Sequence, residues 1–249
     1  MKRFRYGLLA ASLAIAGCTS ADSLFQPIEV REGRLCYADG TDVNLFGFNF
    51  QSCLSFEHGA RMHNQGVLMP LKAQDLKRVT DESFDEIQLL GAEVIRVHLM
   101  PADFTDAEGN LVETIWLDQF LYVMAEAQTR GLYVYLTFLN HLDHDGTQFP
   151  YNKDSFAATY PREDWLVDPK AMAATEQCIR QLLNKVNPYN GQLLKKHPAI
   201  AVLEPVNEPG YWWFEKWQEK NPNGTRDGFE KWSYENTRDY LNRMVKLFR

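Results

Sequence analysis

The sequence predicts an α/β fold in which helices cover a parallel β-sheet. Three observations lead to this prediction: a globular composition, strand-like apolar segments that alternate with amphipathic helical ones, and capping residues or glycines between them. Hydrophobic residues make up 45% and charged residues 24% of the 249 residues, which excludes disordered, coiled-coil and collagen-like chains. Four strand–helix units in succession require parallel strands that are joined by right-handed connections.

The N-terminus is typical of an export signal. Residues 1–5 contain three basic side chains, and residues 7–16 form an apolar stretch that is too short to span a bilayer. The Ile-Ala-Gly-Cys sequence at residues 15–18 resembles the lipobox of bacterial lipoproteins, in which the cysteine becomes the lipidated first residue.

This resemblance implies that residues 1–17 are a lipoprotein signal peptide and that a lipid on Cys18 anchors the protein to a membrane. Residues 18–29 are then a lipidated tether. A threonine rather than an aspartate follows the cysteine, which favours the outer membrane, so we expect an exported protein of the cell envelope. The alternative is a plain secretory signal with an incidental cysteine.

Short apolar segments predict four strands. A hairpin of residues 30–38 and 42–48 around the turn Asp39-Gly40 leads into the first strand, which ends near Asn49. The other three follow in order: residues 92–98, 132–139 and 199–206. The segment 132–139 is nearly all apolar or aromatic, as in a strand that is covered on both faces.

Helical spacing of apolar residues and capping signals predict the helices between the strands. Thr80 caps a first helix, Gly131 closes a second, and Asp168 caps a third that ends at Asn187. A last amphipathic stretch covers residues 241–248. The chain has no internal repeat and no interdomain linker.

The charge balance bears on possible partners. The chain has 33 acidic and 26 basic residues, a net charge of −7. Without residues 1–17 the 33 acidic residues face 23 basic ones, a net charge of −10. Such a surface repels phosphate backbones, so we expect no nucleic-acid partner.

Three cysteines remain besides Cys18: Cys36, Cys53 and Cys178. An odd number cannot all pair within one chain. Export permits disulfides, and Cys36 and Cys53 are the nearest pair in sequence, but spacing does not fix the geometry of a disulfide. We expect buried thiols.

Polar residues end each expected strand. In barrels and open α/β sheets ligands bind at the carboxyl ends of the strands, so these residues are the candidate site: Asn49, Arg96 with His98, Asn140 with His141, and Asn207 with Glu208. A carboxylic acid beside a carboxamide suits acid/base work on a glycosidic oxygen, because partial burial raises the pKa of the acid.

The segment 203–209, Leu-Glu-Pro-Val-Asn-Glu-Pro, resembles the end of the fourth barrel strand in glycoside hydrolase family 5 and its relatives in clan A. Residues 39–49 resemble the opening segment of that family, residues 94–96 its second strand, and residues 131–140 the third strand of its β-mannanase-type members. Pro205 departs from the family pattern, which usually has an aliphatic residue there.

The resemblance implies a (β/α)8 TIM barrel and a retaining hydrolase of a β-linked polysaccharide such as β-mannan or β-glucan, which needs no cofactor. It implies that Glu208 is the acid/base, that Asn207 contacts the sugar ring and that Arg96 supports the nucleophile. The expected substrate-binding residues are Asn49, Asn140, His141, Trp212 and Trp213.

Each of these residues also has a structural interpretation. Arg96 can pair with an acidic neighbour inside the barrel, Asn49 and Asn140 can cap strands and turns, and the two tryptophans can serve packing. Trp165 and Phe104 are expected in the core. A metal site is the less favoured interpretation of His141, Asp143, His144 and Asp145.

Retaining glycosidases need two carboxyl groups about 5–5.5 Å apart, and in this family the nucleophile lies on the seventh strand. Four residues along a strand separate Glu204 from Glu208 by roughly 13 Å, and Glu57 and Glu215 have no motif around them. We therefore expect residues 30–249 to be the N-terminal part of a catalytic domain, with about the first four βα units. The alternatives are a non-catalytic glycan-binding surface lipoprotein and a metal-dependent barrel hydrolase.

Overall fold

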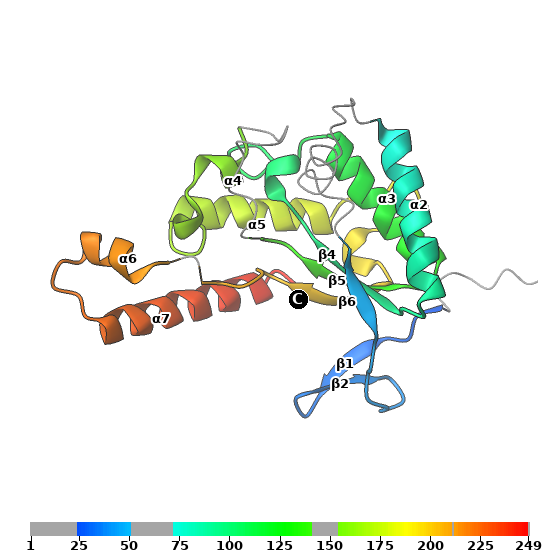
Figure 1. Ribbon diagram of the computed structural model, residues 1–249, viewed down its shortest axis with the longest axis horizontal. Coiled ribbons are helices and arrows are strands. Elements are labelled where there is room, and N and C mark those ends of the chain that lie inside the picture. Colours follow the sequence, from blue (N-terminus) through cyan, green and yellow to red (C-terminus); the bar gives the residue numbers. More distant parts are fainter. Residues whose placement is uncertain (1–23, 51–71, 141–153, 211, 249) are drawn as a thin grey trace, which may run out of the picture.

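The computed structural model describes residues 24–50, 72–140, 154–210 and 212–248 (Figure 1). The expected signal peptide and Cys18 lie outside these residues. Part of the expected tether lies inside them and is folded: Phe25 is buried with its ring 5.2 Å from that of Tyr133, and the backbone N–H of Gln26 donates to the Tyr133 hydroxyl. Packed structure therefore begins before the expected boundary at residue 30.

A two-stranded hairpin comes first. β1 (Ile28–Arg31) pairs antiparallel with β2 (Arg34–Tyr37). Its turn lies at Glu32 and Gly33, both with positive φ, and was not expected from the sequence, whereas the expected turn at Asp39-Gly40 is also present. The Asp39-Gly40 pair makes a second turn, after which Asp42 forms an isolated bridge with Cys36.

The central sheet has four parallel strands in the order β3-β4-β5-β6. Their bounds are Gly47–Phe50 for β3, Val94–His98 for β4, Tyr133–Thr137 for β5 and Ile200–Glu204 for β6. Sequential order and parallel pairing confirm the expected strand–helix units. β6 ends two residues earlier than expected, because Pro205 has no N–H with which to continue the ladder.

Three long helices lie along one side of the sheet, as Figure 1 shows: α2 (Ala73–Leu89), α3 (Ile115–Thr129) and α5 (Pro169–Leu183). The strand side chains that face them are among the most buried in the described chain: Ile95, Val97, Val134 and Leu136. Burial of each such side chain stabilises the fold by about 1.5–3 kcal/mol relative to leaving the side chain exposed. This face is the core of the fold.

The helix ends agree only in part with the expected ones. Asp168 caps α5 as expected, and its carboxylate accepts from the backbone N–H groups of Lys170 and Ala171. Thr80, however, lies in the middle of α2, because its buried hydroxyl accepts from the Gln119 amide on α3 instead of capping a helix. α5 ends at Leu183, four residues before Asn187.

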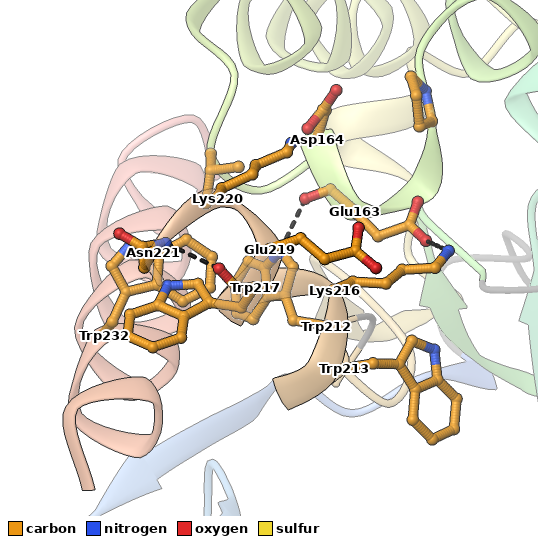
Figure 2. Close-up of a pocket in the computed structure, with 12 residues that line it drawn as sticks. Glu163, Asp164, Trp212, Trp213, Lys216, Trp217, Glu219, Lys220, Asn221 and Trp232 are labelled. Atoms are coloured by element: carbon orange, nitrogen blue, oxygen red, sulfur yellow. Dashed lines mark hydrogen bonds and ion pairs between the residues drawn. The ribbon is translucent and has the colours of Figure 1, made fainter. Parts of the chain in front are cut away.

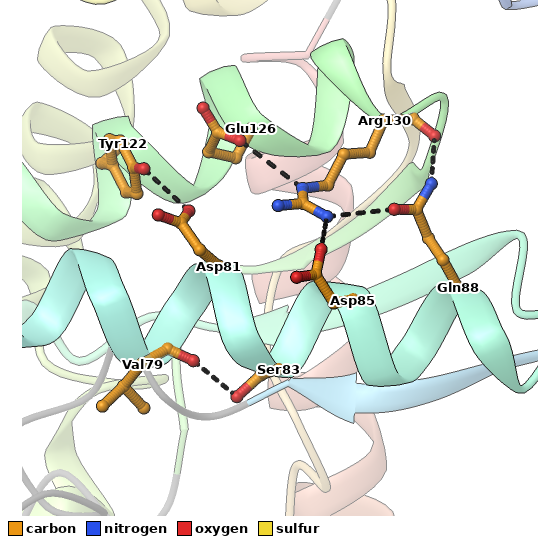
Figure 3. A network of polar contacts seen from close by, with 8 residues as sticks. All are labelled: Val79, Asp81, Ser83, Asp85, Gln88, Tyr122, Glu126 and Arg130. Atoms are coloured by element: carbon orange, nitrogen blue, oxygen red, sulfur yellow. Dashed lines mark hydrogen bonds and ion pairs between the residues drawn. The ribbon is translucent and has the colours of Figure 1, made fainter.

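A polar network joins α2 to α3 (Figure 3). The Arg130 guanidinium donates hydrogen bonds to the Asp85 carboxylate, to the Gln88 amide oxygen at 3.0 Å and to the Glu126 carboxylate at 3.5 Å. The Tyr122 hydroxyl donates to Asp81, and burial together with that carboxylate raises the pKa of Tyr122. The two helices are therefore fixed by charge-assisted bonds as well as by apolar packing.

Short helices and a C-terminal helical pair complete the described chain. The short ones are η2 (Pro101–Asp103), α4 (Phe156–Thr159), η4 (Arg162–Asp164) and η5 (Leu194–Lys196). α6 (Phe214–Lys220) and α7 (Arg226–Val245) follow β6, and their connected ends project away from the sheet in Figure 1. α7 contains the first part of the amphipathic stretch expected at 241–248.

Two further expectations concern burial and membrane spans. Cys36 and Cys178 are buried, as expected, and Cys53 lies outside the described residues. Among the helices of the described residues, none has the length and apolar character to cross a bilayer.

Candidate active site

The four parallel strands carry their polar side chains to one face and one edge of the sheet. Asn49, Arg96 and Tyr135 are register neighbours on β3, β4 and β5. Two residues further along the strands, His98, Thr137 and Glu204 are register neighbours on β4, β5 and β6. Since side chains alternate between the two faces, these residues lie opposite the helix-covered core.

Arg96 connects β4 to the end of β6. Its guanidinium donates to the Glu204 carboxylate from Nη2 at 2.5 Å and from Nε at 3.2 Å. The same Nη2 donates to Oδ1 of Asn207 at 2.9 Å, and Thr137 donates its hydroxyl to Glu204. The expected acidic partner of Arg96 is therefore Glu204, and the amide of Asn207 is fixed in one orientation.

Tyr135 completes this cluster. The Arg96 guanidinium lies 5.1 Å from the centre of its ring, within the range of a cation–π contact. Burial and the neighbouring Glu204 carboxylate raise the pKa of Tyr135. The phenol therefore keeps its proton at neutral pH and remains a hydrogen-bond donor on the open face of the sheet.

Asn140 and His98 meet just beyond the strand ends. Asn140 is buried after β5, and its Nδ2 lies 2.8 Å from Nδ1 of His98 on β4. This contact fixes both side chains. Asn49, by contrast, is exposed on β3 beside Arg96.

Glu208 follows Asn207 in a left-handed backbone conformation, with a φ of 48°. Such a φ is uncommon for a residue with a Cβ and persists where the surroundings impose it, often at functional sites. Asn207 helps to impose it, because it is buried and its backbone N–H donates to the Leu139 carbonyl beyond β5. Glu208 lies past the end of β6 and is exposed, so the expectation that it is partly buried is wrong.

The aromatic candidates separate into surface and core residues. Trp212 is half-buried, and its indole N–H donates to the Glu163 carbonyl at 2.6 Å. Trp213 is 60% exposed. Trp165 and Phe104 are buried in the core, as expected.

Other candidates have no counterpart in this cluster. His141, Asp143, His144, Asp145 and Glu57 lie outside the described residues. Within the described ranges, no group of three or more His, Cys, Asp or Glu side chains is placed to hold a metal ion. Glu215 is an exposed residue of α6 that lies 3.9 Å from Arg226.

Sequence reasoning missed the roles of Glu204, Thr137 and Tyr135. The sequence excludes Glu204 as a nucleophile but does not indicate its contact with Arg96, and it indicates only strand positions for the other two. The alternation of side chains on the third strand would have placed Tyr135 and Thr137 on the same face as Arg96. The cluster therefore could have been found once the strands were aligned in register.

Comparison with solved structures shows which fold the chain has. No protein-family model matches the chain, and no curated protein sequence matches it. The structure is similar to a glycoside hydrolase family 5 mannosidase from Rhizomucor miehei, with a TM-score of 0.50 and 15% identity over 80% of this chain and 52% of that one. This chain has the fold of part of a family 5 glycoside hydrolase barrel.

Two further structures show weaker similarity to this family 5 fold. A GH5_18 protein from Streptomyces cattleya, in complex with GlcNAc, has a TM-score of 0.49 and 19% identity over 82% of this chain and 41% of that one. An endo-1,4-beta-mannanase from Rhizomucor miehei has a TM-score of 0.47 and 16% identity over 74% and 48%. The chain spans about half the length of these proteins, and β3 to β6 are four parallel strands of the eight in such a barrel.

Proposed function

We propose that this protein is a retaining glycoside hydrolase that cleaves O-glycosidic bonds of a β-linked polysaccharide of the β-mannan or β-glucan type. The observation that carries the proposal is the Asn207-Glu208 pair at the carboxyl end of β6, with Asn207 held by Arg96. Catalytic residues of barrel enzymes lie at this end of the strands. The similarity to a family 5 mannosidase favours β-mannan.

The proposed reaction has two steps. First, the Glu208 carboxyl group donates its proton to the glycosidic oxygen as the bond from that oxygen to the anomeric carbon breaks, and a second carboxylate bonds to that carbon. Then the Glu208 carboxylate takes a proton from water, whose oxygen replaces the second carboxylate. One water is consumed for each bond cleaved, and Glu208 ends in its starting state.

The second carboxylate must lie about 5–5.5 Å from Glu208 in a retaining enzyme. Glu204 is unsuited to this role, because Arg96 and Thr137 hold its carboxylate in a structural cluster. We propose that the nucleophile is supplied by a part of the barrel that these 249 residues do not include, in keeping with their coverage of about half of a family 5 structure.

The test compares the full-length gene product with its Glu208→Gln variant on β-mannan and β-glucan. Loss of a general acid/base lowers kcat by about 100- to 10,000-fold, whereas Glu215→Gln, a change at an exposed residue of α6, leaves kcat unchanged. On an aryl glycoside with a good leaving group, azide restores turnover of the Glu208→Gln protein, because azide attacks the glycosyl-enzyme without needing a base. Equal activity of Glu208→Gln and Glu215→Gln would contradict the assignment.

A glycan-binding protein without hydrolytic activity is the second candidate, favoured by the exposed indole of Trp213 close to Glu208 in the chain. It predicts binding of mannan or glucan by the full-length protein with no release of reducing sugar.

We propose further that Cys18 carries a lipid that holds the protein at the cell envelope. The lipobox-like sequence at residues 15–18 supports this proposal. Fractionation of cells tests it: the wild-type protein should be found with the outer membrane, and Cys18→Ser should release it from membranes or block its maturation. A membrane-bound Cys18→Ser protein would contradict lipid anchoring.

A further inference from the structure

A groove lies between the segment 161–167 and the helices α6 and α7, and Figure 2 shows its lining. Its volume is about 370 Å³, within the range of about 300–1,000 Å³ that is usual for ligand pockets. Four tryptophans line it together with charged side chains, among them Glu163 and Lys216: Trp212, Trp213, Trp217 and Trp232.

The two walls of this groove are bonded to each other. Lys216 of α6 makes an ion pair with the Glu163 carboxylate at 3.0 Å, and the Trp212 indole N–H donates to the Glu163 carbonyl. Burial acts to raise the pKa of Glu163, but its hydrogen bonds and the Lys216 charge outweigh burial and lower it. The Glu163 carboxylate is therefore ionised at neutral pH, and its ion pair with Lys216 links the two walls of the groove.

The tryptophans of the groove pack against one another and against Phe229. The Trp217 ring lies 5.7 Å from that of Phe229 and 6.1 Å from that of Trp232, and Trp232 packs edge-on against Trp212 at 4.8 Å. Rings in this range add about 0.5–1.5 kcal/mol per pair beyond area burial. The indoles are therefore preorganised surfaces, which lowers the entropy that a ligand must lose on binding.

The charges of the lining select against an ionic ligand. Three carboxylates, Glu163, Asp164 and Glu219, face two lysines, Lys216 and Lys220. Such a near balance gives no strong field for an anion or a cation. Indole faces with polar groups around them match instead a neutral ligand that has apolar faces and hydroxyl edges, as a hexose ring has.

The place of the groove in the fold connects it to Glu208. Residues 161–167 belong to the loop between β5 and α5, and Trp212 and α6 belong to the loop between β6 and α7. Both loops leave the carboxyl ends of the strands, where barrels bind their ligands, and Trp212 follows Glu208 by four residues.

We propose that this groove binds a stretch of a neutral β-linked hexose chain beyond the unit that reacts at Glu208. The proposal rests on the proposed function for the class of substrate, and it adds Trp217, Trp232 and Lys216 to the residues that bind it. Affinity for long chains then depends on α6, whereas a single hexose unit at Glu208 does not reach it.

The test measures binding of mannohexaose and cellohexaose to the full-length protein that carries Glu208→Gln. By calorimetry, Trp217→Ala should weaken binding of one hexasaccharide about 3- to 10-fold, from the magnitude of a single aromatic contact, and Trp217→Phe should restore most of the loss. Tyr234→Ala is the matched control, because Tyr234 is an exposed aromatic residue of α7 outside the groove. Its affinity should equal that of the parent.

Trp217 also packs within the helical pair, so a second variant guards against misfolding. Trp213 is 60% exposed, and Trp213→Ala removes an indole from the groove with little loss of packing. If both Trp217→Ala and Trp213→Ala left the hexasaccharide affinity unchanged, the proposal that the groove binds a hexose chain would be wrong, even where the protein hydrolyses mannan. Weakened binding in a protein that hydrolyses no glycan would support the groove and overturn the proposed hydrolase activity.

Discussion

Glu204 is held by three donors on the open face of the sheet: two guanidinium nitrogens of Arg96 and the Thr137 hydroxyl. Replacement by glutamine removes the charge that Arg96 faces and leaves a guanidinium that is only 25% exposed without its ionic partner. We expect Glu204→Gln to lower the free energy of unfolding by about 1–3 kcal/mol. Urea unfolding at pH 7 measures this change.

The matched control is Glu29→Gln. Glu29 pairs with Arg31 at 2.8 Å, but both side chains are about half exposed, so its loss should lower the free energy of unfolding much less than Glu204→Gln does. Equal destabilisation by the two substitutions would show that the Arg96–Glu204 pair contributes no more than a surface ion pair.

The left-handed backbone conformation of Glu208 should lower the stability of the fold. A side chain with a Cβ at a φ of 48° is strained by about 1–2 kcal/mol, and glycine is not. We expect Glu208→Gly to raise the free energy of unfolding by about 1 kcal/mol and, as the proposed acid/base role requires, to abolish hydrolysis by the full-length protein. Thermal unfolding measures the first effect and a reducing-sugar assay the second.

Glu208→Ala separates backbone strain from the charge of the side chain. It also lacks the carboxylate but keeps the Cβ, so its stability should stay near that of the wild type. A Glu208→Ala protein as stable as Glu208→Gly would mean that the carboxylate, and not the left-handed backbone, is the source of strain.

The motif residues could be predicted one by one, but their contacts could not. Asn207 and Glu208 follow from their position after a strand, and a partly buried Arg96 requires an acidic partner. That the partner is Glu204 depends on the register of β4, β5 and β6, which includes an irregularity between Val134 and Tyr135. Spacing along one strand excludes Glu204 as a nucleophile but says nothing of its neighbour two strands away.

At the scale of elements, Gly109 fixes how the loop after β4 meets α5. Its φ is 81°, and a Cβ on it would lie 1.9 Å from the Ala174 carbonyl oxygen of α5. Gly109→Ala therefore combines backbone strain with a clash against helical backbone. We expect it to lower the free energy of unfolding by more than about 2 kcal/mol, as measured by urea unfolding.

Gly131 provides the comparison for this prediction. It has a φ of 70°, but a Cβ there would have no atom within 4 Å, so Gly131→Ala carries the backbone strain alone, about 1 kcal/mol. If Gly109→Ala were no more destabilising than Gly131→Ala, the loop would be free to move away from α5, and the close approach would not be needed for the fold.

Elements with a strong local signal were predicted well, and those decided by tertiary contacts were not. The Asp168 cap and the glycine that ends α3 act through their own backbone, so they can be identified from the sequence. Thr80 has the same local signal as a cap, but a hydrogen bond from Gln119 on another helix uses its hydroxyl within α2. The additional turn at Glu32-Gly33 was likewise not predicted, because it depends on the pairing of β1 with β2.

For the molecule as a whole, the two faces of the sheet differ. One face is the core beneath α2, α3 and α5, and the other carries the Arg96 cluster and the half-buried side chains of β6. In a closed barrel, polar side chains on the inner face would be enclosed by the remaining strands. A partial barrel accounts both for the open face of the sheet and for the match to only about half of a family 5 structure.

The edges of this sheet lead to a last prediction. Within the described residues, β3 and β6 each pair on one side only, and Phe46 and Phe48 are exposed at the β3 edge with their rings 5.2 Å apart. Unpaired strand edges beside apolar side chains favour association. We therefore expect the 249-residue chain, produced alone, to self-associate with rising concentration in sedimentation velocity.

Phe48→Lys should reduce this association, because a charged lysine on an edge strand disfavours pairing with another strand. Val30→Lys, on the separate hairpin, makes the same change in charge and should leave the association unaltered. A chain that stays monomeric at all concentrations, or equal effects of the two lysines, would show that the β3 edge is already covered.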